Sequence, residues 1–116
     1  MVNVASKCGL TENNYKQLSD LFDKYYDQGL RMILFPSNQF MNQESGDACQ
    51  IRSFGSKFNE KFVMTEKVDV NGSNVHPVWK WLKEEAPGGF LSNAIKWNFT
   101  KAQILNNWFF YCWCSL

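Results

Sequence analysis

The sequence lacks the features that define several large classes of protein. It carries 12 basic and 11 acidic side chains, so no excess of one charge points to nucleic acid or an anionic membrane. No apolar run approaches the roughly 18 residues that a membrane span needs, and residues 1–10 have neither the apolar length nor the basic start of a signal peptide. We therefore expect no nucleic-acid partner, no transmembrane segment and a cytoplasmic location.

The four cysteines form no Cys-x-x-Cys pair. Cys8 and Cys49 are isolated, whereas Cys112 and Cys114 are separated by a single residue. Without a secretory signal a disulfide framework is not expected, and this spacing does not suit a four-ligand zinc site. We expect neither a bound metal nor a prosthetic cofactor.

The composition nevertheless supports a folded domain. Hydrophobic residues make up 45% of the 116 residues and aromatic residues 16%, which is enough for one domain with a substantial core. Residues 2–5, 30–35 and 66–70 are short segments that predict strands, and an Asn71-Gly72 turn follows the last of them.

A helix is predicted between the first two of these strands. Thr11 is a candidate N-cap, and Gly29 is a plausible C-terminal stop. The apolar residues between them recur at helical spacing, which places them on one face. They are Tyr15, Leu18, Phe22 and Tyr25.

Two further helices are predicted downstream. A polar, turn-rich loop at residues 37–47 precedes the second helix, and the third opens at Pro77, suited to the first helical position, and stops at residues 87–89. The residues that they direct toward the core are Ile51, Phe54 and Phe58, then Val78 and Leu82. Because strands and helices alternate, we expect an α/β fold whose first strands are parallel through a right-handed crossover.

Cys8 lies where the first strand gives way to the first helix. Backbone N–H groups and the helix dipole favour an anion there, and the thiolate is the reactive form of cysteine. Cys8 is therefore a candidate peroxide-reducing residue, although a small apolar residue buried beside a turn also fits. Such a cysteine needs donors that steady the thiolate and the leaving oxygen, and the side chains of Gln43, Trp97 and Asn98 can donate without titrating. Their spacing alone does not bring them together, and Trp97 also suits a core position.

Several motifs resemble, in the right order, those of the glutathione peroxidase family. They are VNVASKCGLTENNYKQL from Val2, LFPSNQFMNQE from Leu34, KVDVNG from Lys67, HPVWKWLK from His76 and SNAIKWNFTK from Ser92. The resemblance implies a thioredoxin-like α/β fold in residues 1–101, with a central mixed sheet flanked by helices. It also implies thiol-dependent reduction of hydrogen peroxide and of organic or lipid hydroperoxides.

The resemblance also assigns the active site. The family's peroxidatic position, selenocysteine or cysteine, falls on Cys8, its glutamine on Gln43, and its tryptophan and asparagine on Trp97 and Asn98. In the implied cycle the Cys8 thiolate attacks the peroxide and becomes a sulfenic acid, which thiols then reduce. The short distance in sequence from His76 to Trp97 resembles the phospholipid-hydroperoxide type, which implies a monomer.

The resemblance leaves the reducing co-substrate open between glutathione and thioredoxin. Thioredoxin users usually have a resolving cysteine in the helix after the NQE motif, and SFGSKF from Ser53 has none. Cys49 lies nearby but off that position, so it is either a resolving cysteine or a bystander. Leu10 stands where some glutathione users have lysine.

The chain departs from the family pattern at both ends. The hairpin that the family places before VNVAS is missing, and after NFTK the chain reads AQILNNWFFYCWCSL, a divergent tail at residues 102–116. We expect a fold that is incomplete at both ends, with a possible replacement hairpin that pairs residues 100–105 with 108–113. The alternative to a working peroxidase is a catalytically impaired fragment that acts, if at all, by binding partners.

Overall fold

The computed structural model of the chain describes residues 1–85 and 93–104, with a small parallel sheet at its centre. The strands are β1 (Val2–Val4), β2 (Ile33–Pro36) and β3 (Val63–Met64), hydrogen-bonded in the order β1-β2-β3. Val2 pairs with Leu34, and Ile33 with Val63, both in parallel register. The parallel arrangement predicted for the first two strands is therefore confirmed.

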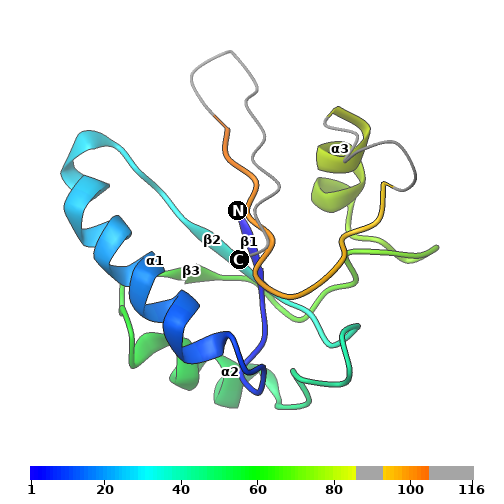
Figure 1. Ribbon diagram of the computed structural model, residues 1–116, viewed down its shortest axis with the longest axis horizontal. Helices are drawn as coiled ribbons and strands as arrows, with labels where there is room; N and C mark the ends of the chain where they lie inside the picture. The colour runs from blue at the N-terminus through cyan, green and yellow to red at the C-terminus, as the bar shows by residue number, and fades with distance from the viewer. Residues whose placement is uncertain (86–92, 105–116) are drawn as a thin grey trace.

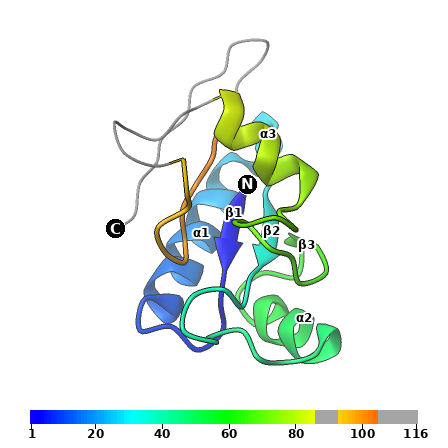
Figure 2. The same cartoon turned by 90° about the vertical axis from the view of Figure 1, so that its right-hand side faces the viewer.

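Helices flank this sheet on both sides. Those within the described residues are α1 (Thr11–Tyr25), α2 (Ala48–Ser56), α3 (Pro77–Glu85) and the 3-10 helix η1 (Tyr26–Gln28). α1 and α3 lie on opposite sides of the strands (Figure 1), and a turn of 90° brings α3 in front of the sheet and α1 behind it (Figure 2). Gly29 ends η1 with a φ of +99°, as its predicted role as a stop requires.

Side-chain alternation along β2 divides the core into two clusters. Leu34 packs with residues of α1, whereas its neighbours Ile33 and Phe35 pack with residues of α3. The first core cluster consists of Val2, Val4, Tyr15, Leu18, Phe22, Met32, Leu34, Phe62 and Phe99. The second core cluster consists of Phe35, Phe40, Val70, Trp79, Leu82, Ile95 and Ala102.

A return segment at residues 98–102 lies antiparallel to β1. Phe99 N–H donates to Asn3 O at 2.7 Å and Ala102 N–H donates to Met1 O at 2.8 Å, with an antiparallel bridge between Val2 and Lys101. In Figure 1 this orange stretch runs beside β1. Residues 98–102, which are distant in sequence from β1, therefore lie at the edge of the parallel sheet.

Two predictions from the sequence are wrong in detail. Thr11 is not the N-cap of α1: Leu10 holds that place, and the Thr11 hydroxyl instead donates to Ala5 O at 2.6 Å. Residues 66–70 do not form a strand: the third strand, β3, ends at Met64. Val68 N–H still donates to Pro36 O at 2.9 Å, but Pro36 has no N–H to donate back, so the ladder does not continue.

The third helix begins at Pro77 as predicted. Leu82 is fully buried, Val78 is half-buried, and the largest buried side chain of the helix is Trp79, which the sequence did not single out. The stop at residues 87–89, Cys112, Cys114 and residues 108–113 of the predicted hairpin lie outside the described residues.

Candidate active site

Cys8 occupies a tight turn between β1 and α1. The backbone N–H of Cys8 donates to Thr11 Oγ1 at 3.0 Å, and Thr11 N–H donates to Cys8 O at 3.0 Å. The N–H of Leu10 approaches the Cys8 sulfur at 3.5 Å. The half-buried Cys8 side chain also packs against the first core cluster. A sulfur that receives a helix N-terminal N–H is suited to carry negative charge.

Gln43 lies on the loop that follows β2, next to the Cys8 turn. Lys7 N–H donates to Gln43 O at 3.0 Å, which ties the residue before Cys8 to this loop. The loop is shaped by Asn38, whose Oδ1 accepts from Glu44 N–H at 2.9 Å. The half-buried Gln43 therefore comes to the carboxyl edge of the sheet, beside the cysteine turn.

The return segment brings Asn98 to Gln43. Asn98 Nδ2 donates to Gln43 Oε1 at 2.9 Å, although the two residues are 55 positions apart in sequence. Asn98 is buried, and the next residue, Phe99, adopts a left-handed φ of 64°. Two of the three donors expected from the sequence are therefore in direct contact.

Trp97 joins the site from the side of the second core cluster. Its half-buried ring lies 5.7 Å from the Phe40 ring, centroid to centroid, and its carbonyl accepts from Asn3 Nδ2 at 3.0 Å. The structure thus gathers Gln43, Trp97 and Asn98 around the loop after β2. The sulfur of Cys8 accepts its hydrogen bond from Leu10, within its own turn. The turn is connected to Gln43 through the backbone hydrogen bond from Lys7.

Two buried polar residues that the sequence did not single out support the site. Asn3 is fully buried in β1, and its Oδ1 accepts from Thr100 N–H at 2.9 Å while its Nδ2 holds Trp97. An asparagine inside the apolar run of residues 2–5 is the signal that could have revealed it. Glu44, directly after Gln43, is also buried, and no sequence pattern marked it.

Glu44 is a carboxyl group in a poorly solvated position. Burial raises the pKa of Glu44, while the hydroxyl and N–H of Ser6 and the charges of Lys67 and Lys7 act in the opposite direction. Burial also raises the pKa of Tyr15, and the Glu44 charge adds to that effect. A carboxyl group with a raised pKa therefore directly follows Gln43 in the loop.

Cys49 and Cys8 are both free thiols, and Cys49 is exposed near the start of α2. Within the described residues, no group of His, Cys, Asp or Glu side chains gathers into a candidate metal site. No helix in residues 1–85 or 93–104 has the length and apolar character to cross a membrane.

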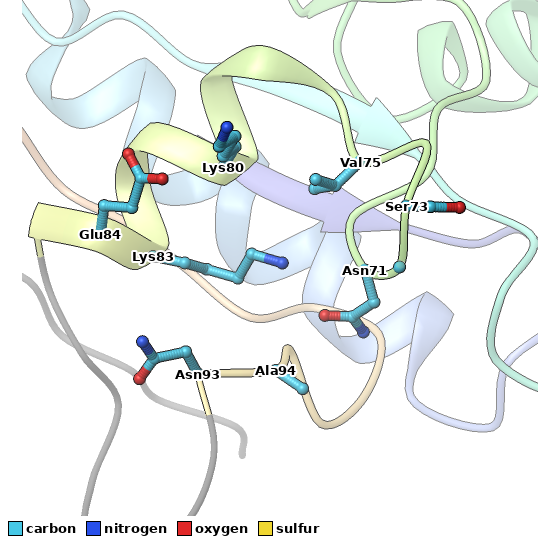
Figure 3. Close-up of a pocket in the computed structure, with 9 residues that line it drawn as sticks. Asn71, Ser73, Val75, Lys80, Lys83, Glu84, Asn93 and Ala94 are labelled. Atoms are coloured by element: carbon cyan, nitrogen blue, oxygen red, sulfur yellow. The ribbon is translucent and has the colours of Figure 1, made fainter.

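A surface hollow lies away from these residues, between α3 and the turn that follows Val70. Figure 3 shows Lys83 extending across it toward Asn71, with Lys80 and Glu84 on the same helix. Lys83 Nζ donates to Val70 O at 2.9 Å, so this amine fastens α3 to the turn. None of the four predicted site residues lines the hollow.

Known proteins are similar in sequence to most of this chain. A family model described as glutathione peroxidase matches residues 1–83. The chain is 51% identical over 108 residues to phospholipid hydroperoxide glutathione peroxidase of Sus scrofa, covering 92% of this chain and 55% of that protein. It is 53% identical over 102 residues to probable glutathione peroxidase 2 of Arabidopsis thaliana, covering 87% of this chain and 60% of that one.

Solved structures give the same picture of the fold. The crystal structure of T. cruzi GPX1 matches with a TM-score of 0.60 at 36% identity, over 84% of this chain and 57% of that one. That of Trgpx in apo form matches with a TM-score of 0.60 at 33% identity, over 84% and 56%. The thioredoxin-like α/β fold expected from the sequence is confirmed, and the chain spans little more than half the length of the relatives it matches.

Proposed function

This chain belongs to the glutathione peroxidase family, and from that premise we propose that it is a thiol-dependent peroxidase with Cys8 as its peroxidatic residue. The observation that carries the proposal is the 2.9 Å hydrogen bond between Asn98 and Gln43, on a loop that Lys7 ties to the Cys8 turn. Amide donors beside a helix-start cysteine suit the stabilisation of a thiolate and of a departing oxygen.

The proposed reaction is a two-electron reduction of a hydroperoxide. The Cys8 thiolate attacks the terminal peroxide oxygen, the O–O bond breaks, and the alkoxide leaves as an alcohol after it takes a proton. Cys8 becomes a sulfenic acid. One thiol condenses with it to form a mixed disulfide and water, and a second thiol attacks that disulfide, which returns the Cys8 thiol and releases the oxidised disulfide.

The proposed substrates follow from the relatives that the chain resembles. Phospholipid hydroperoxides appear in the name of the Sus scrofa relative, and we extend the proposal to hydrogen peroxide and smaller organic hydroperoxides. Glutathione or thioredoxin is the proposed reductant, and no prosthetic group takes part in the cycle. We also propose that the protein acts as a monomer in the cytoplasm.

Peroxide consumption by the purified chain tests the proposal, with glutathione and thioredoxin compared as reductants. Cys8→Ser should reduce the rate to that of the buffer, whereas Gln43→Ala and Trp97→Phe should each slow it by roughly 10²-fold, because they remove donors only. Cys49→Ser is the matched control and should keep full activity with glutathione. Activity that survives in Cys8→Ser would show that the assignment is wrong.

A chain that folds but does not consume peroxide would favour the alternative, a catalytically impaired fragment that acts through binding partners. Near-UV circular dichroism separates this case from a chain that fails to pack, since fixed aromatic side chains give a signal only in a packed core. The many buried aromatic rings of the two clusters make that signal a sensitive readout.

A further inference from the structure

A line of hydrogen bonds connects Lys101, on the return segment, to the sulfur of Cys8. Lys101 Nζ donates to Asn14 Oδ1 at 2.6 Å. Asn14 Nδ2 in turn donates to Leu10 O at 2.9 Å. Leu10 N–H then approaches the Cys8 sulfur at 3.5 Å. Lys101 and Asn14, which are far apart in sequence, are thus both connected to the turn that holds the candidate nucleophile.

The middle of this line is buried and hydrogen-bonded. Asn14 is 1% exposed in the first turn of α1, and its own N–H donates to Leu10 O at 3.0 Å, so that carbonyl accepts two hydrogen bonds from one residue. Leu10 is the N-cap of α1 and offers no side-chain cap. The N-terminal N–H groups are therefore not all occupied by a capping side chain. Asn14 holds Leu10 O, which belongs to the Leu10–Thr11 peptide, whereas the N–H that faces the sulfur belongs to the preceding Gly9–Leu10 peptide. Asn14 therefore acts on this N–H through the backbone of Leu10.

The far end of the line is a cation with reduced solvation. Lys101 is half-buried beside β1, where its residue forms the antiparallel bridge with Val2. Burial lowers the pKa of the Lys101 ammonium from its usual range, so water screens this charge less than it screens an exposed lysine. The charge stands at the far end of the hydrogen-bond line that reaches the Cys8 sulfur, and positive charge is a general influence that favours a thiolate.

We propose that Lys101 is a positioning residue for the peroxidatic cysteine: through Asn14 it fixes the backbone of Leu10, whose N–H faces the Cys8 sulfur, and its charge favours the thiolate. This inference deepens the proposed peroxidase function and rests on it. The same bond also joins the return segment to α1, so a purely structural role is the competing explanation. The two are separated by the charge of the residue at position 101.

The experiment measures the rate at which iodoacetamide labels Cys8 near neutral pH, by peptide mapping, with Cys49 in the same chain as the internal reference. Lys101→Met removes the charge but keeps the aliphatic length, and it should slow Cys8 labelling by about 3- to 10-fold relative to Cys49. Lys101→Arg keeps the charge and should restore the rate to within about twofold. Lys16→Met, which removes an exposed lysine from α1, is the matched control and should change nothing.

Asn14→Asp provides a second variant in case Lys101→Met does not fold. The new carboxylate keeps an acceptor for Lys101 Nζ, neutralises its charge and loses the donor to Leu10, so Cys8 labelling should again slow. An unchanged rate in either folded variant would overturn the inference. Equal slowing in Lys101→Met and Lys101→Arg would also overturn it, because it would show that only the structural contact matters.

The test needs neither peroxide nor reductant, which keeps it distinct from the test of the proposed function. If Cys8 in the unaltered chain reacted no faster than Cys49, the peroxidatic assignment would fail. The ratio of the Cys8 labelling rates in Lys101→Met and in the unaltered chain would still decide the role of Lys101. Conversely, an active peroxidase with an unchanged Lys101→Met labelling rate would retain its function and lose only this inference.

Discussion

The turn that carries Cys8 and the loop that carries Gln43 follow neighbouring parallel strands, but they are held in different ways. The Cys8 turn is fixed by local contacts, chiefly the Thr11 hydroxyl, which accepts from Cys8 N–H and donates to Ala5 O. The Gln43 loop contains two successive non-glycine residues, Met41 and Asn42, with a φ of 53° each. It is held by side chains that reach in from other parts of the loop and of the chain.

The Gln43 loop is supported both from within and by a distant segment of the chain. Asn38 Oδ1 accepts from Glu44 N–H, and its Nδ2 donates to Asn42 Oδ1 at 3.3 Å. Gln39 Oε1 accepts from the N–H groups of Val70 and Asn71, at 2.8 and 2.9 Å. The Cys8 turn is therefore held mainly by local contacts, with the bond from Lys101 to Asn14 behind it, whereas the Gln43 loop also depends on bonds that span 31 and 55 positions. The predictions below test this difference, from the largest effect to the smallest.

Removal of the Thr11 hydroxyl should have the largest effect on stability. Thr11→Val keeps the shape of the side chain but leaves Ala5 O and Cys8 N–H without their partner, which should cost about 2–4 kcal/mol of unfolding free energy. Urea unfolding measures the loss, and Thr11→Ser, which keeps the hydroxyl, should recover most of it. A loss below about 0.5 kcal/mol would mean that the turn is not locally fixed.

The support from Asn38 should be worth less, because Asn38 is only half-buried. Asn38→Ala removes the acceptor of Glu44 N–H and should cost about 1–2 kcal/mol, and it should also lower peroxide reduction because Gln43 is released. Asn38→Asp keeps the acceptor and should preserve both. If Asn38→Ala destabilised the chain without any change in activity, the loop would not depend on this side chain for the position of Gln43.

Glu44 makes the stability of the Gln43 loop depend on pH. Its pKa is raised in the folded chain by burial, so the folded state binds its proton more tightly than the unfolded state. That contribution is fully present below the ordinary carboxyl range and is lost as pH rises through the raised pKa. Glu44→Gln, which does not titrate, should therefore gain stability relative to the unaltered chain as pH rises from 4 to 7. Parallel profiles in urea unfolding would refute this.

The strained backbone of the loop should produce the smallest effect. Met41 is 77% exposed, so its side chain contributes little packing, and a left-handed conformation is costly for a non-glycine residue. Met41→Gly should raise the unfolding free energy by up to about 1 kcal/mol. Asn42→Gly should gain less, because asparagine tolerates this conformation and the variant also loses the bond from Asn38 Nδ2. A destabilised Met41→Gly would contradict the account.

The sequence predicted the local features of the fold better than the long-range ones. The apolar run before Cys8, the helix after it and the start of α3 at Pro77 all follow from neighbouring residues, and the structure has them. Residues 66–70 were assigned wrongly because the outcome depends on the missing N–H of Pro36, on a different strand. The residue pattern of one strand does not show whether the neighbouring strand has the N–H groups needed to pair with it.

The same limit applies to the candidate site. Cys8 is a candidate from its position at a strand-to-helix junction, where a buried bystander also fits, and the family resemblance favours the first interpretation. The hydrogen bond between Gln43 and Asn98 spans 55 residues, and only the family resemblance placed the two side chains in one site. The burial of Asn3 and Glu44 depends on which segments close over them. Asn3 was detectable as a polar residue in an apolar run, whereas Glu44 lies in a polar loop and resembles an exposed residue.

The most direct test of the central claim is to identify which cysteine the peroxide oxidises to a sulfenic acid. The purified, reduced chain is treated with one equivalent of hydroperoxide in the presence of dimedone, which traps sulfenic acids, and the labelled peptides are identified by mass spectrometry. The account predicts that Cys8 carries the label and that the more exposed Cys49 does not. Label on Cys49 without label on Cys8 would contradict it.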